Sequence, residues 1–260
     1  MDKILSSVDG AIATLTFNNP ERHNAVSLEM WRGANAALEA FAANPVVRVV
    51  VLTGAGGKAF VSGADISKFE SERASTDAVE VYNAAVEQFS QTLLHFEKPT
   101  LALIRGYCMG GGIGIVVCCD LRIANETARF GVPAAKLGLG YGFANIRRLM
   151  HLVGPQFVNE IMFTARQFDA VEALGMGLVN RVVSDTEIET QVRQLAETIA
   201  GNAPLTLRAV KTTVRELLRD ESERDVAKCD ALARACFESQ DYQEGRRAFM
   251  EKRKAVFKGS

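Results

Sequence analysis

Histidine is scarce in this sequence, and its cysteines lack the spacing of a metal site. The three histidines, His23, His95 and His151, all lie more than four residues from one another. No two cysteines have the C-x-x-C spacing of many zinc sites, so we expect no metal. An odd number of cysteines is typical of free thiols in a reducing compartment, so we expect a cytoplasmic protein without disulfides. The cysteines are Cys108, Cys118, Cys119, Cys229 and Cys236.

The sequence also lacks an excess of charge of one sign and a long apolar run. A formal net charge of −1 argues against a nucleic-acid-binding protein, which normally carries a concentrated basic face. The longest apolar run, residues 113–119, ends at Asp120 and is too short to span a membrane. No apolar stretch of a secretory signal follows Met1-Asp2-Lys3. With 260 residues, 48% of them hydrophobic, the chain can build the core of one or two globular domains.

Strands and helices alternate over roughly the first 190 residues. Residues 4–8 and 12–17, on either side of Asp9-Gly10, are typical of a hairpin. Ser27 is a helix-capping residue type, and it predicts a helix that runs to about Ala43. The other expected strands are 46–52, which is continuous and β-branched, 99–104, 121–124 and 179–183. The other expected helices are 77–96, one from Ile113, 144–152 and 156–163.

After Asp185 the sequence is helical almost to its end. This order predicts an α/β core at residues 1–195 and a helical region at residues 196–260. Helices without a sheet to cover often cover a partner subunit. Arg147 and Arg148, on an earlier helix, fit the lining of an entrance or a solvated helix face, and we expect the solvated face.

Residues 54–63 form a glycine-rich connection that first suggests nucleotide binding. Residues 54–59 fit G-x-G-x-x-A after a strand, but the following residues lack helical periodicity, so the dinucleotide-binding context is missing. Lys58 is followed by Ala59 rather than Ser or Thr, which excludes the phosphate-binding loop of the NTPases. Neither kind of nucleotide site is expected.

A second glycine run, Gly110-Gly111-Gly112, follows a strand that ends at Ile104 and precedes an apolar helix. The first amides of a helix have no partner within it and attract negative charge. Two such amides can stabilise an enolate oxygen, which is worth about 10²–10³ in rate per donor. The same residues fit a tight packing turn equally well, and this segment alone does not decide between the two.

Ordered motifs along nearly the whole chain favour the first interpretation. They occupy residues 19–26, 58–66, 98–99, 106–112, 119–124, 128–133, 173–179 and 249–254. The second motif has the sequence K-A-F-V-S-G-A-D-I, and the fourth has the sequence G-Y-C-M-G-G-G. Together they resemble the enoyl-CoA hydratase/isomerase family, also called the crotonases.

The resemblance implies a fold, a substrate class and a set of binding residues. The family fold is an α/β spiral of strand–strand–helix turns, with a C-terminal helical region that builds trimers or dimers of trimers. At the matching positions, the N–H groups of Ala64 and Gly111 would hold the thioester oxygen. No separate cofactor is expected, since the coenzyme A thioester is the substrate. The residues expected along coenzyme A are Arg22, Ala25, Ala64 and Lys68, with Phe249 and Lys252 from the end helix, often that of a neighbouring subunit.

The sequence departs from the family pattern at three positions. The lysine that usually follows Asp-Ile is Ser67 here, with Lys68 one position later. Hydratases of the family carry one glutamate two residues after the triple glycine and another after the F-G-x-P segment. This chain has Gly114 and Ala134 at these places. General acid–base groups contribute about 10²–10⁴ each, so efficient water addition is hard to explain. Isomerases of the family usually keep the second glutamate, so isomerisation is disfavoured as well.

Decarboxylation of a malonyl-type thioester needs only an oxyanion site and a polar orienting group. Residues 137–143 resemble the matching segment of methylmalonyl-CoA decarboxylase, where a tyrosine stands at the place of Tyr141. Tyr141 is therefore expected to hydrogen-bond a carboxylate or deliver a proton, the alternative being a packing residue in a loop. The decarboxylase histidine that would stand at Ala64 is missing. The same region also resembles naphthoyl-CoA synthases and ring-opening thioester hydrolases.

The leading hypothesis is thus an acyl-CoA enzyme of lyase type, acting by decarboxylation or non-standard hydration. The alternatives are a catalytically silent acyl-CoA-binding relative, or a thioester hydrolase or isomerase. RNA binding, known for one branch of the family, is disfavoured by the near-neutral charge. The expected partners are an acyl-CoA substrate and further copies of this chain in a homotrimer or dimer of trimers, with no nucleic acid and no membrane.

Overall fold

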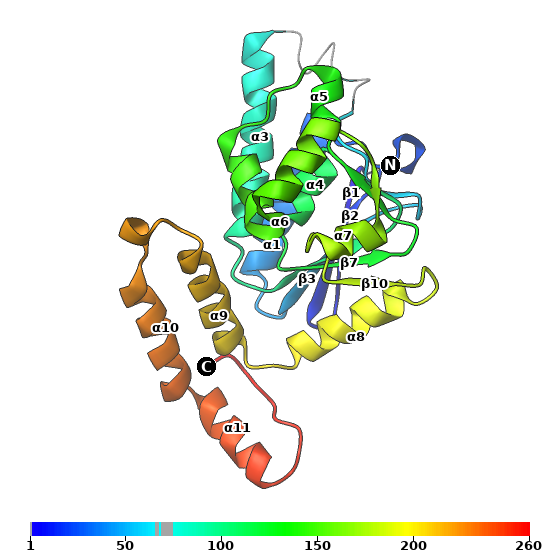
Figure 1. The fold of residues 1–260 in the computed structure, drawn as a ribbon. Coiled ribbons are helices and arrows are strands. Elements are labelled where there is room, and N and C mark those ends of the chain that lie inside the picture. Colours follow the sequence, from blue (N-terminus) through cyan, green and yellow to red (C-terminus); the bar gives the residue numbers. More distant parts are fainter. Residues whose placement is uncertain (1, 66–67, 69–74) are drawn as a thin grey trace.

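A six-stranded sheet lies at the centre of the fold (Figure 1). The computed structural model describes residues 2–65, 68 and 75–260. In sheet order the strands are β1 (Ile4–Asp9), β2 (Ile12–Phe17), β3 (Val49–Gly54), β5 (Thr100–Ile104), β7 (Leu121–Asn125) and β10 (Arg181–Val183). β1 and β2 form the predicted antiparallel hairpin, and the other neighbouring strands are parallel. The continuous β-branched run of β3 fits this central, parallel position.

Helices cover both faces of this sheet. Alternate residues of β3 point to opposite faces, so Val50 and Leu52 join the main core while Val49 and Val51 pack toward α8. The N-terminal cap of α1 is the predicted one, since Ser27 Oγ accepts a hydrogen bond from its third residue. The helices up to α8 are α1 (Leu28–Ala43), α3 (Thr76–Leu94), α4 (Gly111–Val116), α5 (Ala134–Leu137), α6 (Phe143–Thr164), α7 (Ala170–Gly175) and α8 (Ile188–Ala200).

A smaller four-stranded sheet was not predicted from periodicity. Its strands are β4 (Ala59–Val61), β6 (Tyr107–Met109), β8 (Arg129–Gly131) and β9 (Phe168–Asp169), in that order. The connection expected at residues 54–63 therefore contains a strand, as does the segment before the triple glycine. Strands of two or three residues are too short to show an alternating pattern.

Strands of the two sheets alternate along the chain and are followed by helices. β3 leads to β4 and then α3, β5 leads to β6 and then α4, and β7 leads to β8 and then α5. β4, β6 and β8 are parallel neighbours in the smaller sheet. This repeated order confirms the expected spiral of strand–strand–helix turns.

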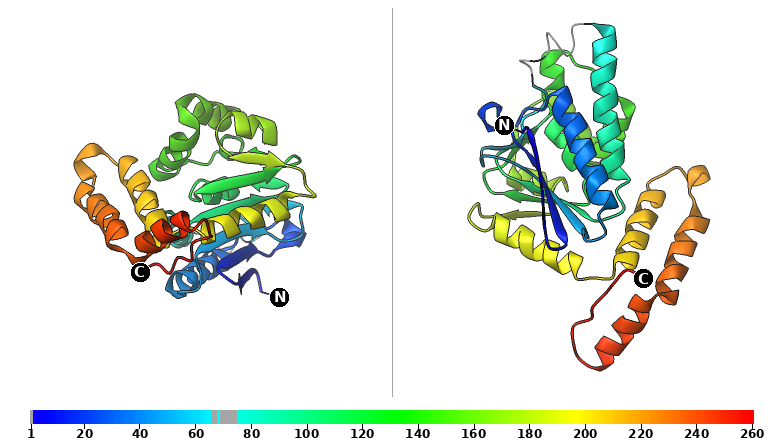
Figure 2. Two further views of the ribbon diagram at one scale, coloured as in Figure 1. Left: turned by 90° about the horizontal axis from the view of Figure 1, so that it is seen from below. Right: turned by 180° about the vertical axis from the view of Figure 1, so that it is seen from behind.

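The C-terminal helices stand to one side of the sheets (Figures 1 and 2). They are α9 (Pro204–Leu217), α10 (Val226–Glu238) and α11 (Gln240–Met250), and they confirm the predicted helical end of the chain. The boundary expected between residues 195 and 196 lies inside α8, and the two-domain division stays a prediction. In the part of the chain that the structure describes, no helix is long and apolar enough to cross a bilayer.

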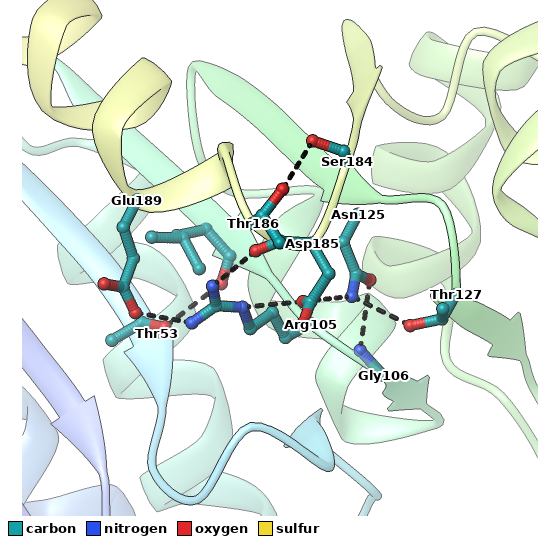
Figure 3. A network of polar contacts seen from close by, with 10 residues as sticks. Thr53, Arg105, Gly106, Asn125, Thr127, Ser184, Asp185, Thr186 and Glu189 are labelled. Atoms are coloured by element: carbon teal, nitrogen blue, oxygen red, sulfur yellow. Dashed lines mark hydrogen bonds and ion pairs between the residues drawn. The ribbon is translucent and has the colours of Figure 1, made fainter.

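The chain crosses from the larger sheet to the smaller one at Arg105 and Gly106, and a polar network holds this corner (Figure 3). Arg105 Nε donates to Asp185 Oδ1 at 2.9 Å, and its Nη2 donates to the carbonyl of Asp185 at 2.8 Å. Asn125 Oδ1 accepts from the Gly106 N–H at 3.4 Å, while Asn125 Nδ2 donates to Asp185 Oδ1 at 2.8 Å. Gly106 has a φ of 60°, and a Cβ there would collide with the carbonyl of Lys58. The start of β6 is thereby fixed in place.

Candidate functional site

Two glycine-containing loops meet at one edge of the smaller sheet. β4 and β6 are parallel, so their carboxyl ends lead to Ala64 and Gly111 side by side. A Cβ placed on Gly111 would lie 3.8 Å from Gly63 Cα, so the two backbones are in contact. The strand that leads into the triple glycine is β6. The expectation that the strand ending at Ile104 does so was wrong, because β6 lies between them.

The N–H groups of Ala64 and Gly111 are both available on these loops. Val26 holds the first loop on either side of Ala64, since its N–H donates to Gly63 at 2.8 Å and its carbonyl accepts from the Asp65 N–H at 3.1 Å. Gly111 is the first residue of α4, where a helix provides no acceptor for the N–H. Within the described residues, neither N–H donates a hydrogen bond. Both N–H groups therefore remain available to an acceptor on a bound molecule.

The three glycines at the start of α4, the cap Gly110 and the first two helical residues, have different surroundings. Gly110 has a φ of 49°, and its N–H donates to the carbonyl of Gly131 at 2.9 Å. A Cβ on Gly112 would collide with the carbonyl of Val61, so this glycine permits close packing of α4 on β4. At Gly111 the nearest atom to an added Cβ is Cζ2 of Trp31, at an ordinary contact distance of 3.6 Å. The packing interpretation therefore applies to Gly112, whereas Gly111 is not required for packing.

Ala64 and Gly111 line a cavity of about 390 Å³. Its wall also includes Ala134, Tyr141 and Asn145, so loops after β4, β6 and β8 meet the start of α6 there. The described part of this wall contains no carboxylate, imidazole or ammonium group. Among the described residues, proton transfer in the cavity would fall to hydroxyl groups.

Two tyrosines line the cavity, and their surroundings differ. Tyr82 is buried, and its hydroxyl donates to the carbonyl of Val26 at 3.1 Å and accepts from Trp31 Nε1 at 2.9 Å. Tyr141 is half-buried, and its hydroxyl makes no hydrogen bond to another described residue. Burial raises the pKa of Tyr141, so its hydroxyl keeps its proton at neutral pH. Tyr141 is thus the tyrosine better placed to donate to a bound group.

Gly114 and Ala134 leave space rather than polar groups near this cavity. Gly114 lies one turn into α4, and a Cβ there would meet no atom within 4 Å. Ala134 is 3% exposed and begins α5, directly on the cavity wall. The structure therefore has space for a longer side chain at position 114, but this chain has glycine there.

The loop expected to bind coenzyme A lies beside Ala64. Arg22 ends the 3₁₀-helix η1 (Pro20–Arg22), and its Nη1 lies 3.5 Å from Oδ1 of the buried Asp65. The Lys68 N–H donates to the Asp65 carbonyl at 3.0 Å, and Ala25 is buried next to the strand-like bridge between Val26 and Ala64. The structure thus brings together Arg22, Ala25, Ala64 and Lys68.

Phe249 and Lys252 lie elsewhere within the single chain. Phe249 is 82% exposed near the end of α11, where it borders a separate apolar cavity between α9, α10 and α11. Lys252 follows α11 with a φ of 54°. Neither residue lines the cavity that contains Ala64 and Gly111.

Sequence reasoning missed a polar cluster beside Tyr141. Arg148, expected on a solvated face, has a side chain that is only 8% exposed, and its Nη2 lies 2.6 Å from Glu87 Oε1. Its Nη1 donates to Oδ1 of Asn145 at 3.3 Å. No local signal indicates this ion pair, because Glu87 lies on α3, 61 residues earlier. The expectation of a solvated Arg148 was therefore wrong.

Comparison with known proteins identifies the family. The sequence profile of the enoyl-CoA hydratase/isomerase family matches residues 7–260. A crotonyl-CoA hydratase from Syntrophomonas wolfei is 35% identical over 257 residues, covering 98% of both chains. A carnitinyl-CoA dehydratase from Salmonella enteritidis is 33% identical over 259 residues, covering 96% of both chains.

A solved structure agrees over the whole chain. The crystal structure of an enoyl-CoA hydratase/carnithine racemase from Magnetospirillum magneticum has a TM-score of 0.94 and 37% identity to this chain. The match covers 100% of this chain and 97% of that chain. Sequence and fold therefore agree, and the chain belongs to the enoyl-CoA hydratase/isomerase family.

Proposed function

We propose that the N–H groups of Ala64 and Gly111 bind the thioester oxygen of an acyl-CoA substrate and stabilise the enolate formed from it. The observation that carries this proposal is the pair of available N–H groups side by side on one cavity wall. Each donor of such a pair is worth about 10²–10³ in rate. Family membership supplies the substrate class, an acyl-CoA thioester.

The reaction that best suits this wall is decarboxylation of a malonyl-type thioester. The bond between the α-carbon and the carboxylate breaks, its electron pair forms the enolate, and carbon dioxide leaves. The enolate then takes a proton at the α-carbon, which Tyr141 delivers and recovers from water. No base has to remove a carbon-bound proton, which fits the positions of Gly114 and Ala134, where the family resemblance expects the hydratase glutamates.

Hydration or dehydration is the second candidate, because the crotonyl-CoA hydratase and the carnitinyl-CoA dehydratase match nearly the whole chain. This reaction needs a group that activates water, and such a group contributes about 10²–10⁴. The described wall offers hydroxyls in place of carboxylates. Hydration by this chain would therefore be slow, or would take its base from the substrate. A silent acyl-CoA-binding relative would bind thioesters without converting them.

Coenzyme A binding and assembly complete the proposal. Arg22 and Lys68 place positive charge beside Ala25 and Ala64, as the phosphates of coenzyme A require, and the Arg22 side chain is 52% exposed. Large apolar side chains are exposed on the C-terminal helices, including Met250 at 81%. A homotrimer or dimer of trimers would cover such residues. It would also allow Phe249 and Lys252 of one copy to approach the coenzyme A of another.

Product analysis by mass spectrometry tests the proposed reaction. The panel contains crotonyl-, 3-enoyl-, methylmalonyl-, malonyl- and cyclic β-ketoacyl-CoA. Loss of carbon dioxide from a malonyl-type ester, abolished by Tyr141→Phe, is the expected result. Rapid hydration of crotonyl-CoA would overturn decarboxylation as the main reaction. Binding of all thioesters without turnover of any would identify the silent relative.

A further inference from the structure

A polar cluster that the proposed reaction does not use reaches the cavity wall through Asn145, which lines the cavity together with Tyr141. Arg148 of α6 is nearly buried, and Glu87 of α3 balances its charge at 2.6 Å. Gln91 Nε2 donates to the same Glu87 oxygen at 2.6 Å and fixes that carboxylate further. The second arm of the Arg148 guanidinium donates to Oδ1 of Asn145 at 3.3 Å. Buried charge and hydrogen bonds thus hold one asparagine at the cavity wall.

Contact with Arg148 determines which way the Asn145 amide points. A guanidinium has only donors, so the atom of Asn145 that faces it must be the acceptor Oδ1. The Nδ2 group is then directed away from Arg148. It donates to no other residue in the described part of the chain, and Asn145 lines the cavity. The cavity therefore has an oriented amide donor at this place.

Tyr141 gives the same region a second donor. It stands four residues before Asn145, just ahead of α6, and its hydroxyl is protonated at neutral pH, since burial only raises the pKa of a group that ordinarily titrates well above neutrality. No acidic side chain of the described wall competes for these donors. An acyl group with negatively charged oxygens can accept from both, whereas a hydrocarbon acyl group leaves both unsatisfied.

We propose that Asn145, positioned by the Arg148–Glu87 ion pair, recognises a carboxylate on the acyl group of the coenzyme A thioester. The inference rests on the proposed function in one respect, that the thioester oxygen lies against Ala64 and Gly111. Asn145 is then a specificity residue, and Arg148 is a positioning residue that acts through it. The substrate is then a thioester of a dicarboxylic acid, a class that includes the malonyl type.

Binding of two matched, unreactive thioesters to the full-length protein tests this assignment. Glutaryl-CoA and pentanoyl-CoA have the same chain length, and neither can lose carbon dioxide through a thioester enolate. Isothermal titration should show that the wild-type protein binds glutaryl-CoA about tenfold more tightly, as one hydrogen bond to a charged group predicts. Asn145→Asp turns the donor into a carboxylate and should abolish or reverse this preference. Asn83→Asp is the control, since Asn83 is exposed on the same cavity and the charge change is identical, and it should keep the preference.

Arg148 variants separate positioning from simple stability. Arg148→Met releases the Asn145 amide and should reduce the preference about threefold or more, whereas Arg148→Lys keeps a donor and should restore most of it. Equal binding of both thioesters by the wild type, or a preference unchanged in Asn145→Asp, would overturn the assignment. If neither thioester bound, the proposed thioester site itself would be contradicted, and the assignment would fall with it.

Discussion

Replacing Gly111 by proline removes one of the two proposed oxyanion donors without removing any side chain. Gly111 is the first residue of α4, the position where proline is best tolerated in a helix, and its φ is not positive. Its N–H donates to no other residue in the described part of the chain, so the substitution breaks no hydrogen bond there. We therefore expect Gly111→Pro to fold but to lose about 10²–10³ in kcat, or about 2.7–4 kcal/mol of transition-state stabilisation.

The assay is turnover of the best thioester of the panel, followed by mass spectrometry of the products. Gly111→Ala is the matched control, because it adds a Cβ at an ordinary 3.6 Å from Trp31 but keeps the N–H. This control should retain activity within about tenfold of the wild type. Circular dichroism and Tm establish that both variants are folded. A folded Gly111→Pro protein with unchanged kcat would refute the assigned role of the Gly111 N–H.

Four further predictions follow from packing, capping and titration. Gly112→Ala should lower the free energy of unfolding by about 1–3 kcal/mol, as measured by urea denaturation, because an added Cβ would collide with the carbonyl of Val61. An unchanged free energy of unfolding would contradict the close packing of α4 on β4. Ser27→Ala should cost about 1 kcal/mol, because Ser27 Oγ accepts the N–H of Met30 at 3.3 Å, and Ser27→Asn is the control that should keep the cap. If protonated Tyr141 is the proton donor, turnover should stay constant from about pH 7 to about pH 9 and fall only above about pH 10. The reason is that burial raises the pKa of Tyr141 above its ordinary value, so the hydroxyl keeps its proton over this range. A decline of turnover near neutral pH would exclude this role. A thiol reagent at about pH 8 should react quickly in the native protein only with the two cysteines that are not buried, Cys229 and Cys236. Burial slows the reaction of the others, and it raises the pKa of Cys118 to about 11. Rapid reaction of all five native thiols would contradict this burial.

The larger sheet was predictable because its signals are local. The hairpin has a turn pair between two alternating segments, and β3 is a continuous β-branched run. The cap of α1 is visible as Ser27. The two predicted helices, 144–152 and 156–163, are the two helical segments of α6, which are separated at Gly154, whose φ of 74° is not helical. In these cases one or a few neighbouring residues determine the outcome.

The smaller sheet and the polar cluster were not predictable in the same way. β4, β6 and β8 have only three residues each, so their pairing comes from the corners that position them rather than from periodicity. Family resemblance, and not the local pattern, implied their place in the spiral. Arg148 belongs to a helix that has both exposed and buried faces, and its partner Glu87 becomes apparent only once α3 and α6 are packed together. Tertiary contacts therefore decide what local sequence leaves open.

The repeated strand–strand–helix turn has a consequence for how this protein can diversify. Because β4, β6 and β8 run parallel, each turn of the spiral presents one loop to the same cavity, at Ala64, Gly111 and Ala134. Two of these loops offer backbone N–H groups, which most substitutions leave in place. The third loop, with the start of α6, offers side chains that substitution can exchange freely. The proposed thioester activation is thus insulated from the residues proposed to choose the reaction, so on this proposal a new chemistry can evolve on the third loop without loss of the old substrate class.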